Sequence, residues 1–455
     1  MSEPASGDAV HRRSSARAGL VTSVIDGAPV PGGRTIPSTN PALINEVVGE
    51  VSFGDAGTVV RAAESAKKAQ ESWAAIPAPI RGRAIAHIGR IIEDNAEALA
   101  RLITAEIGKP YGEALGEVRE IVDTCDFFLG EGRRLYGQTV PSEMPDKQLF
   151  TFRRPVGTVA VITAGNFPVA VPSWYIVPAL LSGNTIVWKP AEYSAVTSAA
   201  FHELVVRGGG LPDGVFNVVF ADGAETFTGL ERSLEAGLID KVGFTGSSAV
   251  GQEIGALTGR HLQTACLELG GKNPLVVTPS ADLDLAVEGA LFSGFGTAGQ
   301  RCTSLGTVIV HESIHDQFLA RFNAAVAGAK VGDPTQDVLM GPMLDEKFAT
   351  RYEEFLGWIQ PHQTVQAAYG RITADNPRDG FVGDPASGLF YHPVVLDGVR
   401  DDDEVFLEET FGPLLPVMKV ANEDEAVRLA NDSPYGLAGS VWTTDPARGL
   451  RVGRQ

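Results

Sequence analysis

Cysteine is scarce in this chain, with only Cys125, Cys266 and Cys302 among 455 residues. A small, odd number of thiols argues against a disulfide framework and favours a reducing compartment, so we expect a cytoplasmic protein. Long hydrophobic runs are also missing, since no apolar segment approaches the roughly 18 residues that a membrane-spanning helix needs. No apolar stretch of the kind found in export signals follows Arg12 and Arg13. The sequence therefore predicts neither a membrane protein nor a twin-arginine export substrate.

Basic residues are in short supply as well. The chain has 37 Lys and Arg against 56 Asp and Glu, a formal net charge of −19, which repels polyanions and argues against a nucleic-acid partner. Backbone N–H groups at a helix N-terminus still allow an anionic cofactor to bind. With 44% hydrophobic and 20% charged residues, the composition is that of a globular α/β protein of two or three units.

The order of helical and strand-like patterns indicates a doubly wound α/β fold. Apolar residues recur at helical spacing over 55–73 and 81–107, with Asn95 near a break, whereas 136–151 loses that period. From residue 158, β-rich runs alternate with helical stretches, as in parallel sheets with crossover helices. The expected strands of the first cycle are 159–163, 185–188, 215–220, 241–245 and 264–269, separated by helices at 169–181, 196–206 and 247–257. After Pro274 a second cycle predicts strands at 275–278, 307–310, near 394 and at 415–420, with helices at 284–292 and 314–327.

Cys302 is the candidate nucleophile. It lies in the segment FGTAGQRCTS at 295–304, where small residues allow close approach of a ligand and the neighbouring Arg301 favours the thiolate. The alternative is a buried packing cysteine, the role that we assign to Cys125 and Cys266.

Glu268 is the candidate general base. It opens the sequence ELGGKNP at 268–274, at the end of an apolar strand where we expect the carboxylate to be buried. A base that activates water needs a carboxylate with a raised pKa, and burial is one cause of such a shift. The alternative is a structural glutamate that pairs with Lys272 or with amides of the glycine turn.

Three further segments each lie at the end of an expected strand. Asn166, in TAGNFP at 163–168, is either a helix cap or an amide that stabilises an oxyanion. The GFTGS segment at 243–247 opens a helix whose free amides suit a pyrophosphate, although it lacks the G-x-G-x-x-G pattern. In WKPAE at 188–192, Lys189 and Glu192 are either ribose ligands or ordinary surface charges.

In this order and spacing, these segments resemble the aldehyde dehydrogenase superfamily from about residue 40 to the end of the chain. The resemblance implies Cys302 as nucleophile, Glu268 as base and Asn166 as oxyanion donor. It also implies NAD or NADP as cofactor and no metal site. The residues implied to hold the cofactor are Lys189, Glu192, Gly243, Ser247, and Glu409 and Phe411 of the EETFGP segment at 408–413.

The implied reaction oxidises an aldehyde to a carboxylic acid. The Cys302 thiolate adds to the carbonyl carbon, and the Asn166 side chain and the Cys302 N–H hold the oxyanion. Hydride transfer then leaves a thioester, which water activated by Glu268 hydrolyses. Relatives that pass the acyl group to coenzyme A usually lack this glutamate, so we expect hydrolysis. Glu192 favours NAD over NADP, because a carboxylate near the adenosine ribose repels a 2′-phosphate.

The substrate prediction is a semialdehyde acid. Arg301 and the segment GEVREIVDTCD at 116–126 are similar to antiquitin-like and other semialdehyde-oxidising branches, which would make Arg301 a ligand of a distal carboxylate. Lys272 departs from the antiquitin branch, which usually has Asn there. Phe167, Val171 and Trp174 are expected on the helix after Asn166, where they either line the substrate channel or pack in the core.

The implied architecture is a Rossmann-like cofactor domain (21–135 and 152–265), an α/β catalytic domain (266–444) and a β arm (136–151) that assembles homodimers or homotetramers. We expect 1–20 to be a disordered tail and 445–455 a truncated C-terminal segment, because family members usually continue with a loop and a final strand. Either the sequence is trimmed, or the protein is shorter, with an open substrate entrance and an unpaired arm edge.

Two alternatives to this enzyme stay open. A catalytically silent relative would bind NAD and serve a structural role. A cofactor-independent cysteine esterase would act on esters through Cys302 and Glu268, although no histidine partner for Cys302 stands out near the motif.

Overall fold

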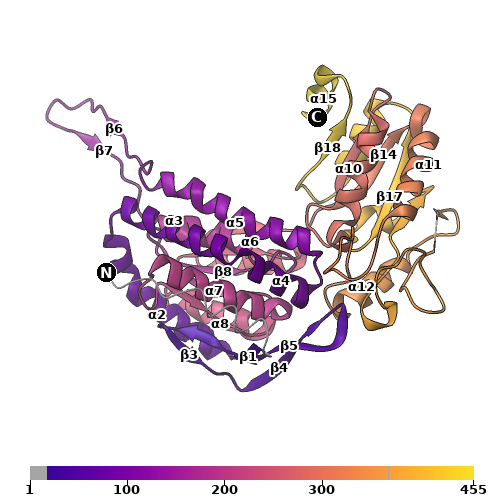
Figure 1. The fold of residues 1–455 in the computed structure, drawn as a ribbon. Coiled ribbons are helices and arrows are strands. Elements are labelled where there is room, and N and C mark those ends of the chain that lie inside the picture. Colours follow the sequence, from indigo (N-terminus) through magenta and orange to yellow (C-terminus); the bar gives the residue numbers. More distant parts are fainter. Residues whose placement is uncertain (1–17, 367) are drawn as a thin grey trace. The chain divides into compact units, whose positions relative to one another are not determined.

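Two largely parallel β-sheets organise the chain, one in each of two units (Figure 1). The computed structural model describes residues 18–366 and 368–455. Unit 1 consists of the described residues up to Thr39 together with Val47–Glu106 and Ala114–Glu268, and unit 2 of Asn40–Glu46, Ile107–Glu113 and Leu269–Gln455. Most of the predicted tail at 1–20 lies outside the described residues, and residues 18–20 belong to the first strand. Among the described residues, no helix has the length and apolar character needed to cross a membrane.

The sheet of unit 1 has the strand order β12-β11-β8-β9-β10-β2-β3. Its strands are β2 (Ser23–Ile25), β3 (Ala28–Val30), β8 (Thr158–Ile162), β9 (Thr185–Lys189), β10 (Phe216–Val218), β11 (Lys241–Thr245) and β12 (Ala265–Glu268). From β12 to β10 every pair is parallel, whereas β2 and β3 pair antiparallel. The chain winds outward from β8 to β10 and then restarts at β11 on the other side of β8. This doubly wound order confirms the predicted fold class and puts the topological switch point between β8 and β11.

The helices of unit 1 connect and cover these strands. They are α2 (Ala56–Ala75), α3 (Ala78–Asp94), α4 (Ala96–Ile107), α5 (Tyr111–Glu131), α6 (Ala170–Leu181), α7 (Ala195–Gly209), α8 (Gly223–Glu235) and α9 (Ser248–Arg260). A short 3-10 turn, η1 (Glu192–Ser194), precedes α7. The predicted helices at 55–73 and 81–107 are confirmed, the second divided at Asn95 as expected. The capping box of Asp55 and Thr58 fixes the start of α2.

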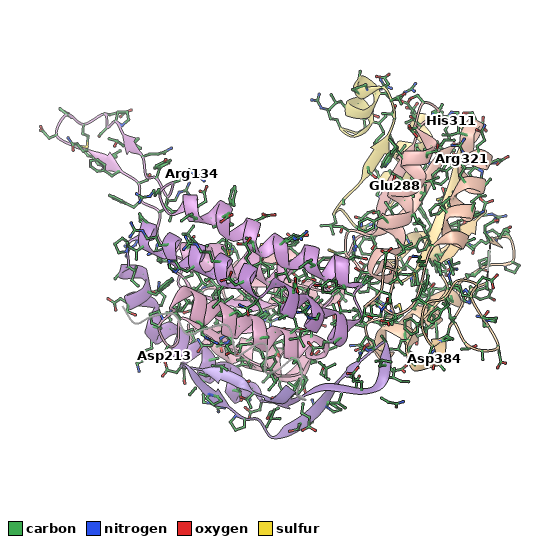
Figure 2. The ribbon with its side chains drawn as sticks, in the orientation of Figure 1. Arg134, Asp213, Glu288, His311, Arg321 and Asp384 are labelled. Carbon is green, nitrogen blue, oxygen red and sulfur yellow. The ribbon has the colours of Figure 1, made fainter. Side chains whose placement is uncertain are left out.

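The N-terminal strands and the arm complete this part of the chain. Strands β1 (Ala18–Val21), β4 (Arg34–Asn40) and β5 (Leu43–Phe53) form a three-stranded sheet that the sequence patterns did not reveal. The segment at 136–151 contains β6 (Thr139–Val140) and β7 (Leu149–Phe150), an antiparallel hairpin that extends past the end of α5 in Figure 1. Figure 2 places Arg134, which pairs with Glu131, where α5 gives way to this hairpin.

The sheet of unit 2 has the order β15-β16-β17-β14-β13-β18. Its strands are β13 (Asn273–Val277), β14 (Leu305–His311), β15 (Thr364–Val365), β16 (Val394–Asp397), β17 (Leu414–Val420) and β18 (Ser440–Trp442). All neighbours are parallel except β15 and β16. The helices are α10 (Leu283–Phe295), α11 (Glu312–Gly328), α12 (Glu346–Leu356), α13 (Glu404–Leu407), α14 (Glu423–Asn431) and α15 (Pro446–Val452), with 3-10 turns η2 (Gly296–Gly299) and η3 (Pro385–Ser387).

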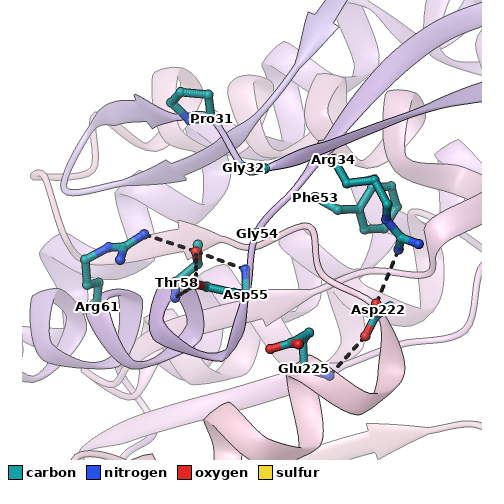
Figure 3. Close-up of a pocket in the computed structure, with 11 residues that line it drawn as sticks. Pro31, Gly32, Arg34, Phe53, Gly54, Asp55, Thr58, Arg61, Asp222 and Glu225 are labelled. Atoms are coloured by element: carbon teal, nitrogen blue, oxygen red, sulfur yellow. Dashed lines mark hydrogen bonds and ion pairs between the residues drawn. The ribbon is translucent and has the colours of Figure 1, made fainter.

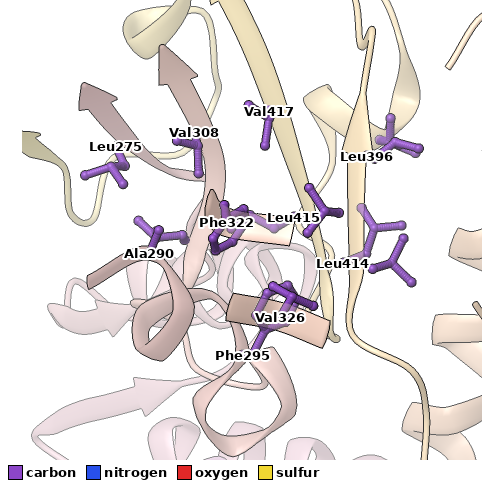
Figure 4. Packing of buried hydrophobic residues seen from close by; sticks show 14 of the residues in the cluster. Leu275, Ala290, Phe295, Val308, Phe322, Val326, Leu396, Leu414, Leu415 and Val417 are labelled. Carbon is purple, nitrogen blue, oxygen red and sulfur yellow. The ribbon is translucent and has the colours of Figure 1, made fainter. Parts of the chain in front are cut away.

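A continuous apolar core holds unit 2 together. Figure 4 shows Leu275, Val308 and Val417 from three neighbouring strands packing over Phe322 and Phe295 of α11 and α10. All five side chains are essentially buried, and the two phenylalanine rings stack at 6.1 Å. On the outer side of the two helices, Figure 2 shows charged groups such as Arg321, which pairs with Asp284. This amphipathic division agrees with the predicted second α/β cycle.

Candidate active site

Four of the predicted site residues lie at one edge of the unit 1 sheet. Lys189 and Glu268 end β9 and β12, while Asn166 follows β8 and Ser247 follows β11. Because these strands are parallel, their carboxyl ends meet at the same edge. Ligands of open α/β sheets bind at this edge, close to the switch point between β8 and β11. The sequence spacing thus places these groups where the fold binds ligands.

Asn166 is not the cap of the helix that follows it. Helix α6 starts at Ala170 with Val169 as its N-cap, and the N–H groups of Val169 and Ala170 both donate to the Glu117 carboxylate, at 2.9 and 3.1 Å. The Asn166 side chain is nevertheless buried, at 6% exposure. The helix-cap alternative for Asn166 is therefore wrong, and a polar role for its buried amide remains.

The helices that leave this edge differ in what occupies their N-termini. Glu117 occupies the N-terminus of α6, and Glu106 accepts from Val196 N and Thr197 N at the start of α7. Asp222 caps α8 in the same way. The cap of α9 is the neutral Ser247. Among the described residues, no carboxylate bonds to the first-turn amides of α9, so of these four helix N-termini it is the one suited to an anion.

The predicted ribose ligands are close together. The Lys189 ammonium donates to the Glu192 carboxylate at 2.7 Å, with the lysine buried and the glutamate side chain 42% exposed. Burial of Lys189 excludes the ordinary surface-charge alternative for that residue. Gly243 lies inside β11, where a Cβ would come within 2.6 Å of the Tyr175 ring of α6. That glycine lets the helix approach the strand, and the Tyr175 hydroxyl shares a hydrogen bond with Thr245.

Glu268 is exposed, contrary to the expected burial, and so is Cys266, which the sequence had indicated as a packing residue. Both side chains lie on the same side of β12, which is the outer strand of the sheet and is paired on one side only, with β11. An edge strand at the end of a doubly wound sheet has less helix cover than its neighbours, and the alternating sequence ACLE carries no sign of that position. Cys125, by contrast, is buried as expected, which raises the pKa of its thiol to about 12.

Three of the predicted substrate residues lie just before or within the first turns of α6. Phe167 is half-buried and precedes the helix, which begins only after Pro168, so its expected place on the helix is wrong. Val171 is buried at 6% exposure, whereas Trp174 is 49% exposed. Trp174 thus offers a surface to a ligand, and Val171 packs in the core.

In unit 2 the predicted residues lie at the opposite end of the strands. Cys302 precedes β14, Glu409 and Phe411 precede β17, and the glycine turn at 269–272 precedes β13, all at the amino edge of the parallel sheet. The Cys302 residue is half-exposed, and its carbonyl accepts from Asn273 Nδ2 at 2.8 Å. An accessible thiol on a fixed turn suits a nucleophile better than a buried packing cysteine.

A tightly bonded turn leads into Cys302. Thr297 and Ala298 have positive φ angles of 50° and 54°, which is uncommon for residues with a side chain. Glu113, which the sequence analysis missed, accepts from both the N–H and the hydroxyl of Thr297, at 3.1 and 2.6 Å. Arg301 forms an ion pair with the same carboxylate and lies 4.7 Å from the centre of the Phe292 ring. These contacts stabilise the turn, and they occupy the guanidinium.

Glu409 and Lys272 belong to the same amino edge. Glu409 accepts from Gly271 N at 3.2 Å. Burial raises the pKa of its carboxyl, although the bond from Gly271 N and the positive charges of Arg351 and Lys272 each lower that pKa. Lys272 is buried and donates to Val405 O and Thr410 Oγ1. Burial lowers the pKa of Lys272 to about 7. Lys272 therefore binds the segment before β17. The alternative that Lys272 pairs with Glu268 is wrong.

Phe411 is held in a left-handed conformation, with φ 45°, and its ring lies 5.6 Å from the Phe348 ring. The fixed ring position agrees with a residue that presents a flat face to a ligand.

A separate pocket of about 330 Å³ lies in unit 1 (Figure 3). Arg34 and Arg61 line it, together with the starts of α2 and α8. Both helix starts are already capped by their own aspartates, Asp55 and Asp222, and Arg34 pairs with Asp222. The pocket contains none of the predicted site residues.

Comparison with known proteins identifies the family. The model of the aldehyde dehydrogenase family matches residues 30–455, so the chain belongs to that family. Glutarate-semialdehyde dehydrogenase of Pseudomonas aeruginosa is 35% identical over 95% of this chain and 86% of that protein. Succinate-semialdehyde dehydrogenase (NADP(+)) of Escherichia coli is 35% identical over 92% of this chain and 84% of that protein. Betaine aldehyde dehydrogenase of Staphylococcus aureus, solved with NAD+, superposes with a TM-score of 0.90 at 31% identity, covering 100% of this chain and 88% of that one.

These likenesses confirm the predicted family and its enzymatic class. The protein is an NAD(P)-dependent aldehyde dehydrogenase, which oxidises an aldehyde to a carboxylic acid.

Proposed function

We propose that Cys302 is the nucleophile of this aldehyde oxidation. Its thiolate adds to the aldehyde carbon, forming a C–S bond while the carbonyl π electrons move to oxygen. The buried Asn166 amide and the Cys302 N–H stabilise that oxyanion. The observation that carries the proposal is the half-exposed Cys302 thiol on a turn fixed by Glu113 and Asn273, in contrast to the buried Cys125.

The residues of the cofactor site fit a dinucleotide. The start of α9, whose cap Ser247 is neutral, suits the pyrophosphate, and Lys189 with Glu192 suits the ribose hydroxyls, while Gly243 allows the close approach of α6 beside this turn. Glu409 and Phe411 are assigned to the nicotinamide ribose and ring. When bound, oxidised NAD(P) supplies the acceptor for the hydride that leaves the aldehyde carbon. The exposed Glu192 carboxylate favours NAD, because it would repel a 2′-phosphate.

Glu268 is proposed as the base of the second half-reaction. It takes a proton from water as the water oxygen bonds to the thioester carbon, and the C–S bond then breaks to return the Cys302 thiolate and release the acid. The exposure of Glu268 on the edge strand gives it access to water. The water-activating role therefore rests on accessibility and not on burial.

The proposed substrate class is a semialdehyde acid, because two of the compared relatives are semialdehyde dehydrogenases. Arg301 stays the candidate ligand of the distal carboxylate, which would have to displace Glu113 from the guanidinium. Changing Arg301 to Gln distinguishes this role from turn stabilisation. Carboxylate binding predicts a loss of kcat/KM for succinate semialdehyde but not for butanal, whereas turn stabilisation predicts equal losses.

The experiment that tests the function is a screen of NADH and NADPH formation. Aliphatic, aromatic and carboxylate-bearing aldehydes are offered with NAD and NADP in parallel, and we expect the fastest turnover with a semialdehyde acid and NAD. Absence of turnover with every aldehyde, together with NAD binding, would favour the silent relative. Hydrolysis of p-nitrophenyl acetate without dinucleotide binding would favour the esterase.

Unit 1 is proposed as the cofactor domain and unit 2 as the catalytic domain, in a cytoplasmic homodimer or homotetramer. The three free cysteines support a reducing compartment. The β6–β7 hairpin and its flanks expose Tyr136, Phe150 and Phe152 at 54–79%, as expected of an assembly surface. Deleting residues 138–151 should reduce the mass measured by analytical ultracentrifugation, and an unchanged mass would remove the arm from assembly.

A further inference from the structure

Asn273 is the first residue of β13, and its side chain bonds to the segments that precede two other strands, β14 and β18. Its Nδ2 donates to Cys302 O at 2.8 Å and to Ser304 O at 2.7 Å, both just before β14. Its Oδ1 accepts from Ala438 N at 2.9 Å, just before β18. The side chain is 2% exposed. One buried amide thus uses both of its donors and its acceptor to tie three segments of the amino edge together.

The contact leaves no space around the nucleophile's carbonyl. A Cβ on Gly271 would lie 2.6 Å from Cys302 O and 2.8 Å from Asn273 Oδ1. The same Gly271 donates its N–H to Glu409. The Cys302 backbone is therefore enclosed by Asn273 and Gly271, and Gly271 in turn is bonded to Glu409, which we assign to the cofactor.

Helix dipoles cannot supply this fixation, because α10 ends at Phe295 and directs carbonyl groups, not N–H groups, toward the turn that leads to Cys302. The carbonyl groups of Cys302 and Ser304 need donors when buried, and Asn273 provides them from a strand whose position the sheet determines.

We propose that Asn273 is a positioning residue for the nucleophile. By holding the carbonyl of Cys302, it fixes the backbone from which the thiol reaches the aldehyde carbon, and it acts through Cys302 without touching the substrate. This inference rests on the proposed role of Cys302. Small misplacements of reacting groups reduce rates strongly, so losing the amide should slow thioester formation by roughly 10- to 100-fold.

The chain contains a matched control in unit 1. Asn217 of β10 is also fully buried, donates through Nδ2 to Gly214 O and Ile186 O, and accepts from Asp26 N. Replacing either asparagine with serine removes an equivalent buried amide. Of these two asparagines, Asn273 is the one that bonds to the Cys302 backbone, so the two variants separate positioning from general destabilisation.

The test measures the first-turnover burst of NADH in the full-length enzyme, alongside NAD affinity by fluorescence titration. We expect Asn273→Ser to slow the burst by roughly 10- to 100-fold with NAD affinity within about twofold of the parent, and Asn217→Ser to change neither substantially. Equal slowing in both variants, or a parallel loss of NAD affinity in Asn273→Ser, would overturn the proposal. Asn273→Asp, which keeps the shape but loses donors, is the second variant if serine prevents folding.

A Cys302→Ala enzyme separates this inference from the proposed function. If that variant retains the burst, Cys302 is not the nucleophile, and Asn273 then has no nucleophile to position. If Cys302→Ala abolishes the burst and Asn273→Ser and Asn273→Asp leave it at the parent rate, the nucleophile stands and the positioning role is refuted.

Discussion

The two sheets present functional groups at opposite ends of their strands. In unit 1 the candidate residues lie at the carboxyl ends of β8, β9, β11 and β12, and helices begin after the first three of these strands. In unit 2 they precede the amino ends of β13, β14 and β17, and a 3-10 turn or a helix ends before the last two of these strands. The carboxyl edge offers backbone N–H groups and the positive ends of helix dipoles, whereas the amino edge offers carbonyl groups.

This difference explains which side chains bond to the backbone at each edge and which kind of group each edge can bind. Three helix N-termini of unit 1 bond to Glu117, Glu106 and Asp222, whereas the cap of α9 is the neutral Ser247. Unit 2 instead uses side-chain donors, with Asn273 bonded to Cys302 O and Lys272 bonded to Val405 O. The first arrangement suits an anionic cofactor, and the second suits a thiol on a fixed backbone, the roles that we propose for the two edges.

The largest expected effect concerns the Cys302 thiol of unit 2. If aldehyde oxidation does not need this thiol, the proposed difference between the two edges is wrong. Changing Cys302 to Ala should lower aldehyde oxidation by roughly 10⁴-fold or more, because the variant lacks the thiol that we propose forms the acyl intermediate. NAD affinity, which we propose depends mainly on unit 1, should stay nearly unchanged in a fluorescence titration. Cys125→Ala, at a buried thiol, is the control and should keep turnover. Substantial aldehyde oxidation by Cys302→Ala would refute the nucleophile assignment.

Glu268 tests the contribution of unit 1 to the second half-reaction. The Glu268→Gln variant should retain the first burst of NADH but lose roughly 100-fold or more in steady-state rate, because thioester hydrolysis lacks its base. Stopped-flow absorbance separates the two phases. A variant with the parent's steady-state rate would remove Glu268 as base, and loss of the burst itself would place Glu268 in the first half-reaction.

The sequence alone predicted the parallel cycles and most of their elements. Strands such as β11 at 241–245 and β9 at 185–189 were anticipated within one residue, because buried parallel strands appear as short apolar runs between helical periods. The small strands at 18–53 were missed, since their mixed and mostly exposed residues show no clear alternation. Helix α5 was not assigned either, although its apolar spacing is helical.

For the site, the sequence identified candidate residues that lie in recognisable segments. It did not identify the residues that hold those segments in place. Glu113 and Glu117 lie four residues apart on α5, yet bond to partners far away in the sequence, at Thr297 and Val169. Such pairings depend on tertiary structure and leave no local pattern. The exposure of Glu268 was misjudged for the same reason, because whether β12 is an edge strand is decided by the order of the sheet.

The N-terminus of α9 sharpens the comparison within unit 1. Changing Ser247 to Asp keeps a good helix cap but adds a negative charge, and so should weaken NAD binding by roughly 10-fold without lowering thermal stability. Isothermal titration and a melting curve measure both. Asn422→Asp at the cap of α14 is the control, because it makes a similar change at a helix start on the carboxyl side of the unit 2 sheet. Unchanged NAD affinity in Ser247→Asp would exclude α9 as the anion site.

Lys272 gives the smallest expected effect and tests the side-chain support of unit 2. Burial lowers its pKa from the ordinary 10.5 to about 7, so between these values the unfolded chain holds a proton that the folded chain has released. Stability of the parent therefore rises with pH through this window, and Lys272→Met should abolish that contribution.

The melting temperature of the parent should rise by about 2–4 °C relative to that of Lys272→Met between pH 7 and 9.5. Below pH 7 the difference between the two melting temperatures should be constant. The exposed Lys347→Met on α12 serves as the control for loss of a lysine. A difference between parent and Lys272→Met that is flat across the window would mean that Lys272 keeps its proton in the fold. The bond to Val405 O would then be that of a permanently charged donor, and the amino edge would contain a buried cation at every working pH.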